Sequence, residues 1–203
     1  MPNNFQLILA SSSPQRIKIL ESINIIPDNI IAPEIDETPL RNEKPDKLVL
    51  RLAEAKATKV ALDSKENAFI LAADTIVGTK ARVFEKAFTD EEVKKYLEFF
   101  SGRKIQIKTA IAVIKIVNGS ISRTATKLVI STVKFKRLRT AELDHYIATK
   151  KGINVSGGFS IEGYGEALIQ NITGSHSGII GLPIAETCRL LEGLGYDTIK
   201  SKS

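Results

Sequence analysis

The strongest constraint on the fold is a pair of long strand patterns that meet at Asn118-Gly119. Residues 105–117 alternate in polarity and are rich in β-branched side chains, and residues 120–135 form a second long strand pattern after the turn. Asn-Gly is the dipeptide most typical of a two-residue hairpin turn, because both of its residues adopt positive φ readily. The sequence therefore predicts an antiparallel hairpin in the middle of the chain.

Helix and strand patterns alternate before this hairpin. Strands are expected at residues 6–9 and near residues 29–31, and the apolar run 69–73, which ends on Asp74, is typical of a buried central strand. Helices are expected in five places: from Pro14 with Ser13 as N-cap, over residues 48–62, from Thr89 to Phe100, from Thr140, and after Pro183. This order predicts an α/β or α+β fold with a mixed sheet.

The amino-acid composition excludes some classes of binding site and binding partner for this chain. The 203 residues are 43% hydrophobic, which suits one domain or two small lobes with a substantial core. One cysteine and two histidines exclude an internal disulfide and a Cys/His zinc site. No apolar run approaches membrane-spanning length, so no membrane partner is expected and the default compartment is the cytoplasm. The net charge of +6 suits an anionic partner, either a nucleic acid or a small phosphorylated molecule, and composition does not choose between them.

The first candidate site is the turn between the first expected strand and helix, with the sequence Ala-Ser-Ser-Ser-Pro-Gln-Arg at residues 10–16. Backbone N–H groups at a helix N-terminus attract anions, serine hydroxyls add donors, and Arg16 adds a planar cation. A serine N-cap followed by an exposed arginine is the commoner explanation of such a segment. The segment is not a Walker loop, because it lacks the G-x-x-x-x-G-K-[ST] pattern.

Carboxylates supply the next two candidates. Asp74 ends a buried strand pattern, where open α/β sheets place their ligands, and the apolar residues before it and Thr75 after it favour a site. The alternative is a polar strand terminus or a cap for the next turn. Glu37 closes the acidic stretch 34–37, which is suited either to holding Mg²⁺ or to solvation between prolines. Carboxylates in two places, with cations near them in the sequence, supply the parts for metal-assisted phosphate chemistry.

Three further segments are similar to known functional motifs but do not match them. The glycine-rich stretch 157–165 is no dinucleotide fingerprint, because Leu168 stands where the third glycine belongs. Residues 174–178 carry His176 where a nucleophile elbow needs serine. The basic run 134–139 contains one aromatic residue in a chain without tryptophan, so we interpret it as a solvated strand end and expect no nucleic-acid partner.

Short motifs occur in a fixed order along almost the whole chain. Residues 9–16 are similar to the signature L-A-S-x-S-P-R-R, and Ala73-Asp74-Thr75 looks like an A-D-T motif. Glu37 and the helix residue Lys56 fall at an acidic and a basic motif position. Glu85-Lys86 stands in place of a G-K-P motif, and further matches lie at residues 101–102, 109, 158–163 and 181–183. With this set of motifs the chain resembles the Maf family of nucleotide pyrophosphatases.

The resemblance implies an α/β fold with a mixed twisted sheet and flanking helices, in which residues 1–203 form one domain with two lobes around a cleft, related to inosine triphosphate pyrophosphatases. It also implies hydrolysis of a nucleoside triphosphate to the monophosphate and pyrophosphate with Mg²⁺ or Mn²⁺, and a homodimer. Asp74 would activate water or bind the metal, and Glu37 would help to hold the metal. The groups expected to neutralise the triphosphate are Ser13, Arg16, Lys56 and Lys86.

The sequence departs from the family pattern at Gln15, Ala87 and Gln106, which replace an arginine, a proline and a histidine. Gln15, Thr75 and Glu162 occupy three positions that separate the substrate groups of the family, and they match neither the dTTP/UTP set nor the 7-methyl-GTP set in full. The base preference is therefore open. The alternative function is a non-catalytic nucleotide-binding regulator of cell division, because the family name comes from septum formation.

Overall fold

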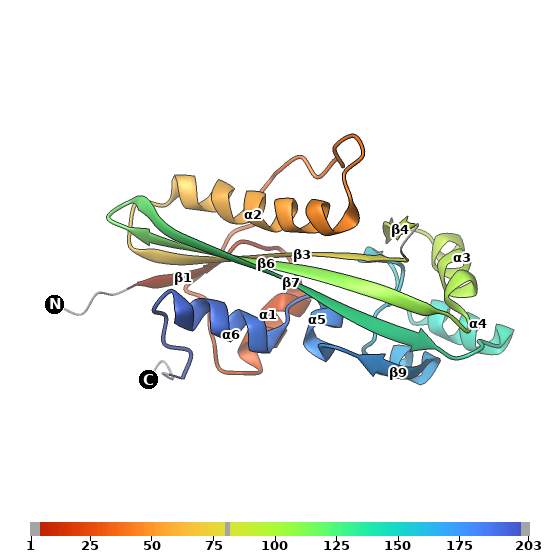
Figure 1. Ribbon diagram of the computed structural model, residues 1–203. Helices are drawn as coiled ribbons and strands as arrows, with labels where there is room; N and C mark the ends of the chain where they lie inside the picture. The colour runs from red at the N-terminus through yellow and green to blue at the C-terminus, as the bar shows by residue number, and fades with distance from the viewer. Residues whose placement is uncertain (1–4, 80–81, 200–203) are drawn as a thin grey trace. The chain divides into compact units, whose positions relative to one another are not determined.

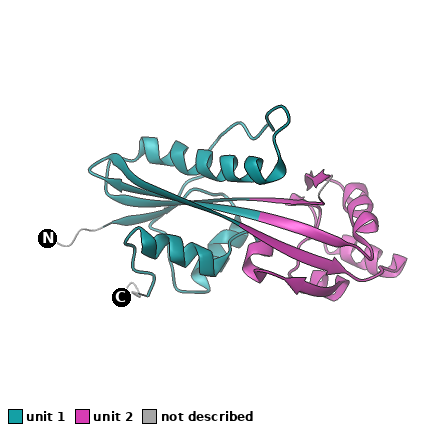
Figure 2. Ribbon diagram, viewed as in Figure 1, with its two compact units in different colours: residues 1–74, 109–128, 181–203 teal, residues 75–108, 129–180 magenta. Residues whose placement is uncertain are grey.

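The computed structural model describes residues 5–79 and 82–199, and these divide into two compact units. Unit 1 comprises residues 1–74, 109–128 and 181–203, and unit 2 comprises residues 75–108 and 129–180 (Figure 2). Three long strands contribute residues to both units, namely Ala68–Gly78 (β3), Lys104–Val117 (β6) and Ser120–Phe135 (β7).

The main sheet is mixed, as expected, and its strands follow the order β2-β1-β3-β6-β7-β9. The remaining members of this path are Gln6–Leu9 (β1), Asn29–Ile30 (β2) and Ile169–Thr173 (β9). β1 pairs in parallel with both β2 and β3, whereas β7 and β9 are antiparallel. The turn between β6 and β7 has positive φ at both Asn118 and Gly119, as the hairpin prediction requires.

Helices cover both faces of the sheet in unit 1. Pro45–Asp63 (α2) lies on one face, and Pro14–Glu21 (α1) and Ile184–Gly193 (α6) lie on the other (Figure 1). The apolar run that precedes Asp74 in β3 is fully enclosed, since Ile70 and Leu71 have no exposed surface. A strand covered on both faces needs such a continuous apolar sequence.

Unit 2 has a separate core rich in aromatic side chains. Its helical elements are Asp90–Phe100 (α3), Thr140–Ala148 (α4), the 3₁₀ segment Gly163–Leu168 (η1) and His176–Ile180 (α5), and its short strands are Val83–Phe84 (β4), Lys86–Ala87 (β5) and Val155–Ser156 (β8). Phe84, Phe100, Phe135 and Tyr146 are fully buried, and Phe135 meets Phe159 edge to face with 4.8 Å between the ring centroids. Thr89 caps α3 through a complete capping box, which confirms the predicted start of that helix.

Two predicted boundaries are wrong. The strand expected to end at Asp74 continues to Gly78, because the β-branched residues Thr75, Ile76 and Val77 favour extended backbone. Asp74 is therefore an interior residue of β3 and not a strand terminus. The helix expected from residue 48 begins at Pro45, since proline fits the first position of a helix, where no N–H partner is needed.

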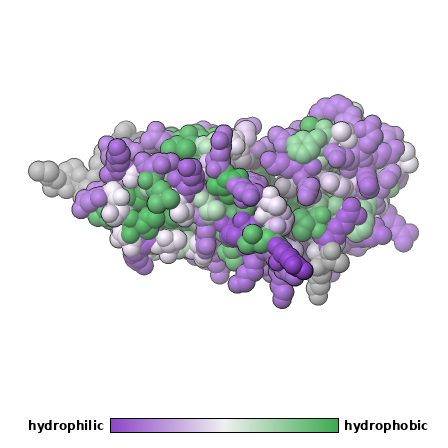
Figure 3. All heavy atoms as spheres, turned by 90° about the horizontal axis from the view of Figure 1, so that it is seen from above, coloured by the Kyte–Doolittle hydropathy of each residue, from purple (hydrophilic) through white to green (hydrophobic). Residues whose placement is uncertain are grey.

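The face seen from above in Figure 3 is mostly hydrophilic, and its hydrophobic side chains lie in separate patches. Within residues 5–79 and 82–199, no helix combines the length and the apolar character that a bilayer crossing requires.

Candidate active site

The centre of the candidate site is a cluster of three charged side chains in unit 1. The Lys56 Nζ lies 2.5 Å from Asp74 Oδ1 and 2.8 Å from Glu37 Oε1. Lys56 and Asp74 are almost buried, with 12% and 10% of their side chains exposed, whereas the Glu37 side chain is 56% exposed. One ammonium group therefore holds two carboxylates together at the edge of the core.

Regular elements fix two of these three groups. Asp74 extends from the buried strand β3, and Lys56 from α2, the helix that covers one face of the sheet in unit 1. The helix neighbours of Lys56 that face the core are Ala53 and Ala57, both without exposed surface. Their small side chains let the helix approach the strand closely, which brings the lysine within reach of Asp74.

A second set of contacts fixes Arg16 at the start of α1. Its Nη1 donates to Ser11 Oγ at 3.0 Å, and its Nε donates to the carbonyl oxygen of Gly181 at 3.0 Å. Burial lowers the pKa of Arg16, and the nearby charges of Asp74 and Glu37 oppose this by raising it. The guanidinium thus belongs to the same electrostatic cluster as the Lys56 ion pairs.

Ser13 and Gln15 lie in the same turn and contact each other. The Ser13 hydroxyl donates to Gln15 Oε1 at 3.3 Å, and the Ser13 N–H donates to Ser11 Oγ at 3.2 Å. Ser13 is the N-cap of α1, as predicted, but its side chain accepts no capping hydrogen bond from the helix. The hydroxyl thus points along the turn instead of closing the helix end.

Three predicted site residues belong to unit 2. Lys86 is exposed and pairs with Ser156 in the β5–β8 ladder, and the Ser156 hydroxyl donates to the carbonyl oxygen of Thr75 at 3.4 Å. Thr75 and Lys86 of unit 2 are therefore both neighbours of Ser156. Glu162 is exposed at the N-cap of η1, and its N–H donates to Ser160 Oγ.

The structure thus brings together four predicted site residues of unit 1 that interact through their charges. They are Arg16, Glu37, Lys56 and Asp74. Sequence reasoning did not identify the two acceptors that hold Arg16, which are Ser11 and the Gly181 carbonyl. Ser11 stands inside the first motif, and Gly181 begins the motif at 181–183. The motifs therefore marked both positions. The Gly181 contact itself was not predictable from residue type, because any residue carries a main-chain carbonyl.

Asp74 and Glu37 are the groups in this cluster suited to a metal. Both present oxygen, the ligand that Mg²⁺ and Mn²⁺ prefer, and both converge on one cation, Lys56 Nζ. Among the described residues, no three His, Cys, Asp or Glu side chains gather closely enough to hold a metal ion. The donor set fits a cation that takes its other ligands from water and substrate phosphates, which is the usual arrangement for Mg²⁺.

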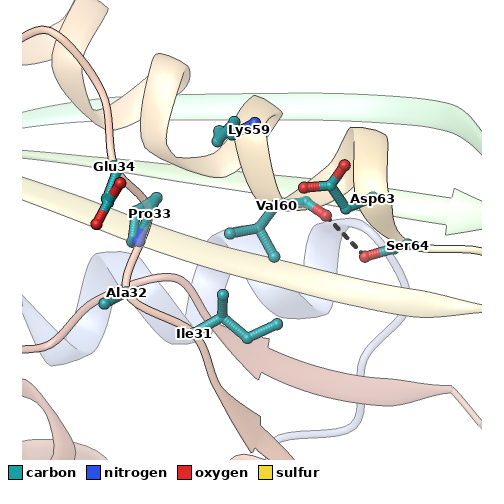
Figure 4. Close-up of a pocket in the computed structure, with 8 residues that line it drawn as sticks. All are labelled: Ile31, Ala32, Pro33, Glu34, Lys59, Val60, Asp63 and Ser64. Carbon is teal, nitrogen blue, oxygen red and sulfur yellow. Dashed lines mark hydrogen bonds between the residues drawn. The ribbon is translucent and has the colours of Figure 1, made fainter.

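A pocket of about 290 Å³ lies elsewhere on α2, between residues 31–34 and the C-terminal part of the helix (Figure 4). Its walls include Ile31, Pro33, Lys59 and Asp63. None of the predicted site residues lines it, so it is separate from the charged cluster.

Comparison with known proteins identifies the family. The family model for Maf-like proteins matches residues 6–194. A nucleoside triphosphate pyrophosphatase of Rickettsia felis is 45% identical over 193 residues, covering 95% of each chain. One of Orientia tsutsugamushi is 44% identical over 195 residues, covering 96% of this chain and 95% of its own. A HAM1 protein from Coxiella burnetii has a similar fold, with a TM-score of 0.51 and 16% identity over 94% of this chain and 100% of its own. The chain belongs to the Maf-like protein family.

Proposed function

We propose that this protein is a nucleoside triphosphate pyrophosphatase, which hydrolyses its substrate to the nucleoside monophosphate and pyrophosphate with the help of Mg²⁺ or Mn²⁺. The observation that carries the proposal is the ion cluster in which Lys56 joins Asp74 and Glu37, with Arg16 in the same field. Carboxylates that can take a proton and cations that can neutralise phosphate oxygens are what this hydrolysis requires. The names of the curated relatives support the same reaction class.

The proposed reaction is attack of water on the α-phosphorus. Asp74 accepts a proton from the water as its oxygen bonds to phosphorus, and the bond from the α-phosphorus to the bridging oxygen breaks. Pyrophosphate leaves with the electron pair of that bond. Asp74 is suited to this role because β3 holds it rigidly and little of its side chain meets solvent.

The cations of the cluster stabilise the charge that develops on the phosphate chain. Arg16 supplies a planar guanidinium, which is fixed by its hydrogen bonds to Ser11 and to the Gly181 carbonyl. Lys56 supplies a compact ammonium group on α2. Ser13 adds a hydroxyl donor at the start of α1. The role of Lys86 as a further cation for the triphosphate stays a prediction from the sequence. Because such groups are positioned in advance, they stabilise the transition state at little reorganisation cost.

Asp74 and Glu37 would hold the metal ion, which when bound withdraws charge from the phosphate oxygens and lowers the pKa of water. Glu37 fits this role because more than half of its side chain is exposed, so it can exchange its ammonium partner for another cation. Lys56 would then keep Asp74 as its partner, and the side of the ammonium that faced Glu37 could meet the substrate.

The base preference is proposed to depend on Gln15, Thr75 and Glu162. Glu162 is an exposed carboxylate that can accept hydrogen bonds from a guanine-type edge, whereas Thr75 matches the pyrimidine group of the family. A homodimer and a location in the cytoplasm stay predictions.

The test is pyrophosphate release from dTTP, UTP, 7-methyl-GTP and ITP with Mg²⁺, with Mn²⁺ and with a chelator. We expect release from at least one nucleotide, dependence on the metal, and a fall of at least about 100-fold in kcat for Asp74→Asn. Equal activity in the variant would remove Asp74 from its role. Nucleotide binding without any pyrophosphate would instead favour the non-catalytic regulator.

A further inference from the structure

Glu37 is carried by a segment that has no regular structure of its own. Residues 31–44, here called the 31–44 loop, connect β2 to α2 without a helix or strand, and residues 36–42 are exposed. Figure 1 shows the loop running past α2 and turning back into the N-terminal end of the helix. The ion pair with Lys56 is partly exposed on the Glu37 side, and such a pair alone holds a loop weakly.

A second ion pair ties the same loop to the same helix. Arg51 of α2 donates from Nε to Glu43 Oε1 and from Nη2 to Glu43 Oε2, each at 2.8 Å. This two-point contact is the strong form of an arginine–carboxylate bond. Only 7% of the Glu43 side chain is exposed, and the Arg51 guanidinium lowers the pKa of Glu43 to about 2.

The Arg51–Glu43 pair reaches the backbone beside Glu37. Arg51 Nη2 also donates to the carbonyl oxygen of Thr38 at 3.1 Å, and Thr38 directly follows Glu37. Glu43 Oε2 accepts the Leu40 N–H at 3.0 Å, so the carboxylate also joins the two ends of the turn at residues 40–43. One guanidinium and one carboxylate therefore fix the loop at Thr38, at Leu40 and at Glu43.

The turn at residues 40–43 is itself well defined. The Glu43 N–H donates to the Leu40 carbonyl oxygen at 2.9 Å, and Asn42 has φ +61°, a conformation that asparagine tolerates better than most residues. Asp36 Oδ1 accepts the Thr38 N–H at 2.9 Å across Glu37. The chain around Glu37 is thus held in shape, and Arg51 attaches that shape to α2.

Arg51 and Lys56 lie on one continuous helix, so the distance between them is constant. We propose that Arg51 and Glu43 form a positioning clamp, which sets the approach of Glu37 to Lys56 and Asp74 by fixing the 31–44 loop on α2. This inference rests on the proposed function for its catalytic consequence, whereas its structural part concerns the loop alone. Neither residue touches the reacting groups; both act through Glu37.

The test uses Arg51→Lys, which keeps the charge and removes the planar fork. The matched control is Arg41→Gln, which removes an exposed arginine from the same loop. Glu43→Gln is the reciprocal variant, in case Arg51→Lys folds poorly, and thermal unfolding of each protein checks the fold. Two quantities are measured: amide hydrogen exchange of residues 36–43, and kcat/KM for pyrophosphate release in the wild-type and Glu37→Gln backgrounds.

We expect Arg51→Lys to speed exchange in residues 36–43 and to lower kcat/KM, each by about tenfold, because the two-point contact with Glu43 and the hydrogen bond to the Thr38 carbonyl are lost although the charge remains. Arg41→Gln should change both by less than about twofold, as surface substitutions usually do. In the Glu37→Gln background, Arg51→Lys should have almost no further effect, because the residue through which it acts is already altered.

Unchanged exchange in Arg51→Lys would overturn the clamp. An equal fall in kcat/KM with and without Glu37 would overturn its action through Glu37. A wild-type protein that releases no pyrophosphate would contradict the proposed function instead, and the exchange result would then decide on the clamp by itself.

Discussion

Replacement of Lys56 by methionine tests the ion cluster through the stability of the fold. Methionine keeps the length and the flexible stem of the lysine but removes its charge. Asp74 then stays in β3, 10% exposed, without the ammonium that lies 2.5 Å from it. The unfolded chain solvates that carboxylate fully, so the variant should be less stable.

The structure sets the size of this effect between two limits. An exposed ion pair contributes at most about 1 kcal/mol, whereas removal of one partner from a buried pair costs about 3–5 kcal/mol. Lys56 and Asp74 are almost buried, so the cost should be close to that of a buried pair. Arg16 reduces the cost, because its charge still attracts Asp74. We therefore expect a loss of about 2–3 kcal/mol in the free energy of unfolding.

The assay is urea unfolding followed by circular dichroism. Lys59→Met is the matched control, because Lys59 is an exposed lysine of the same helix, and its replacement should cost less than about 0.5 kcal/mol. The double variant Lys56→Met with Asp74→Asn should recover part of the loss, since the unpaired charge is removed. Equal stability of Lys56→Met and Lys59→Met would refute the account of a buried pair.

Two further predictions concern unit 2. Hydrogen bonding to Arg139 lowers the pKa of Glu142 from 4.5 to about 2. The ionised Glu142 therefore stabilises the fold fully above pH 4.5, and this stabilisation is lost as the pH falls from there toward 2. Acid unfolding of Glu142→Gln should thus depend less on pH in that range than unfolding of the wild type. A Cβ at Gly165 would lie 1.9 Å from the Ser160 carbonyl oxygen, whereas one at Gly193 would meet nothing within 4 Å. Gly165→Ala should thus lower the thermal midpoint by several degrees and Gly193→Ala should not, and equal midpoints would contradict the packing around residue 160.

The parts of the fold that the sequence predicted are those with local signals. The hairpin at Asn118-Gly119 and the capping box at Thr89 are set by neighbouring residues, and the structure has both where they were expected. The end of β3 was missed because a carboxylate normally marks the end of an apolar run. Asp74 remains inside the strand because Lys56, distant in sequence, compensates its charge.

The candidate site was predictable to a different degree. Residue type and motif order pointed to Asp74, Glu37, Lys56 and Arg16, but no periodicity could show that one ammonium joins two carboxylates. The attachment of Arg16 to the Gly181 carbonyl depends on main-chain geometry, which residue type does not encode. The Arg51–Glu43 pair was missed for a related reason, because charged residues near a loop are usually solvated.

The most direct test of the central claim is hydrolysis of the preferred nucleotide in water enriched in ¹⁸O, followed by mass spectrometry of the products. If water attacks the α-phosphorus, the label enters the nucleoside monophosphate and the pyrophosphate carries none. Label in pyrophosphate or in inorganic phosphate would show attack on another phosphorus and would contradict the account.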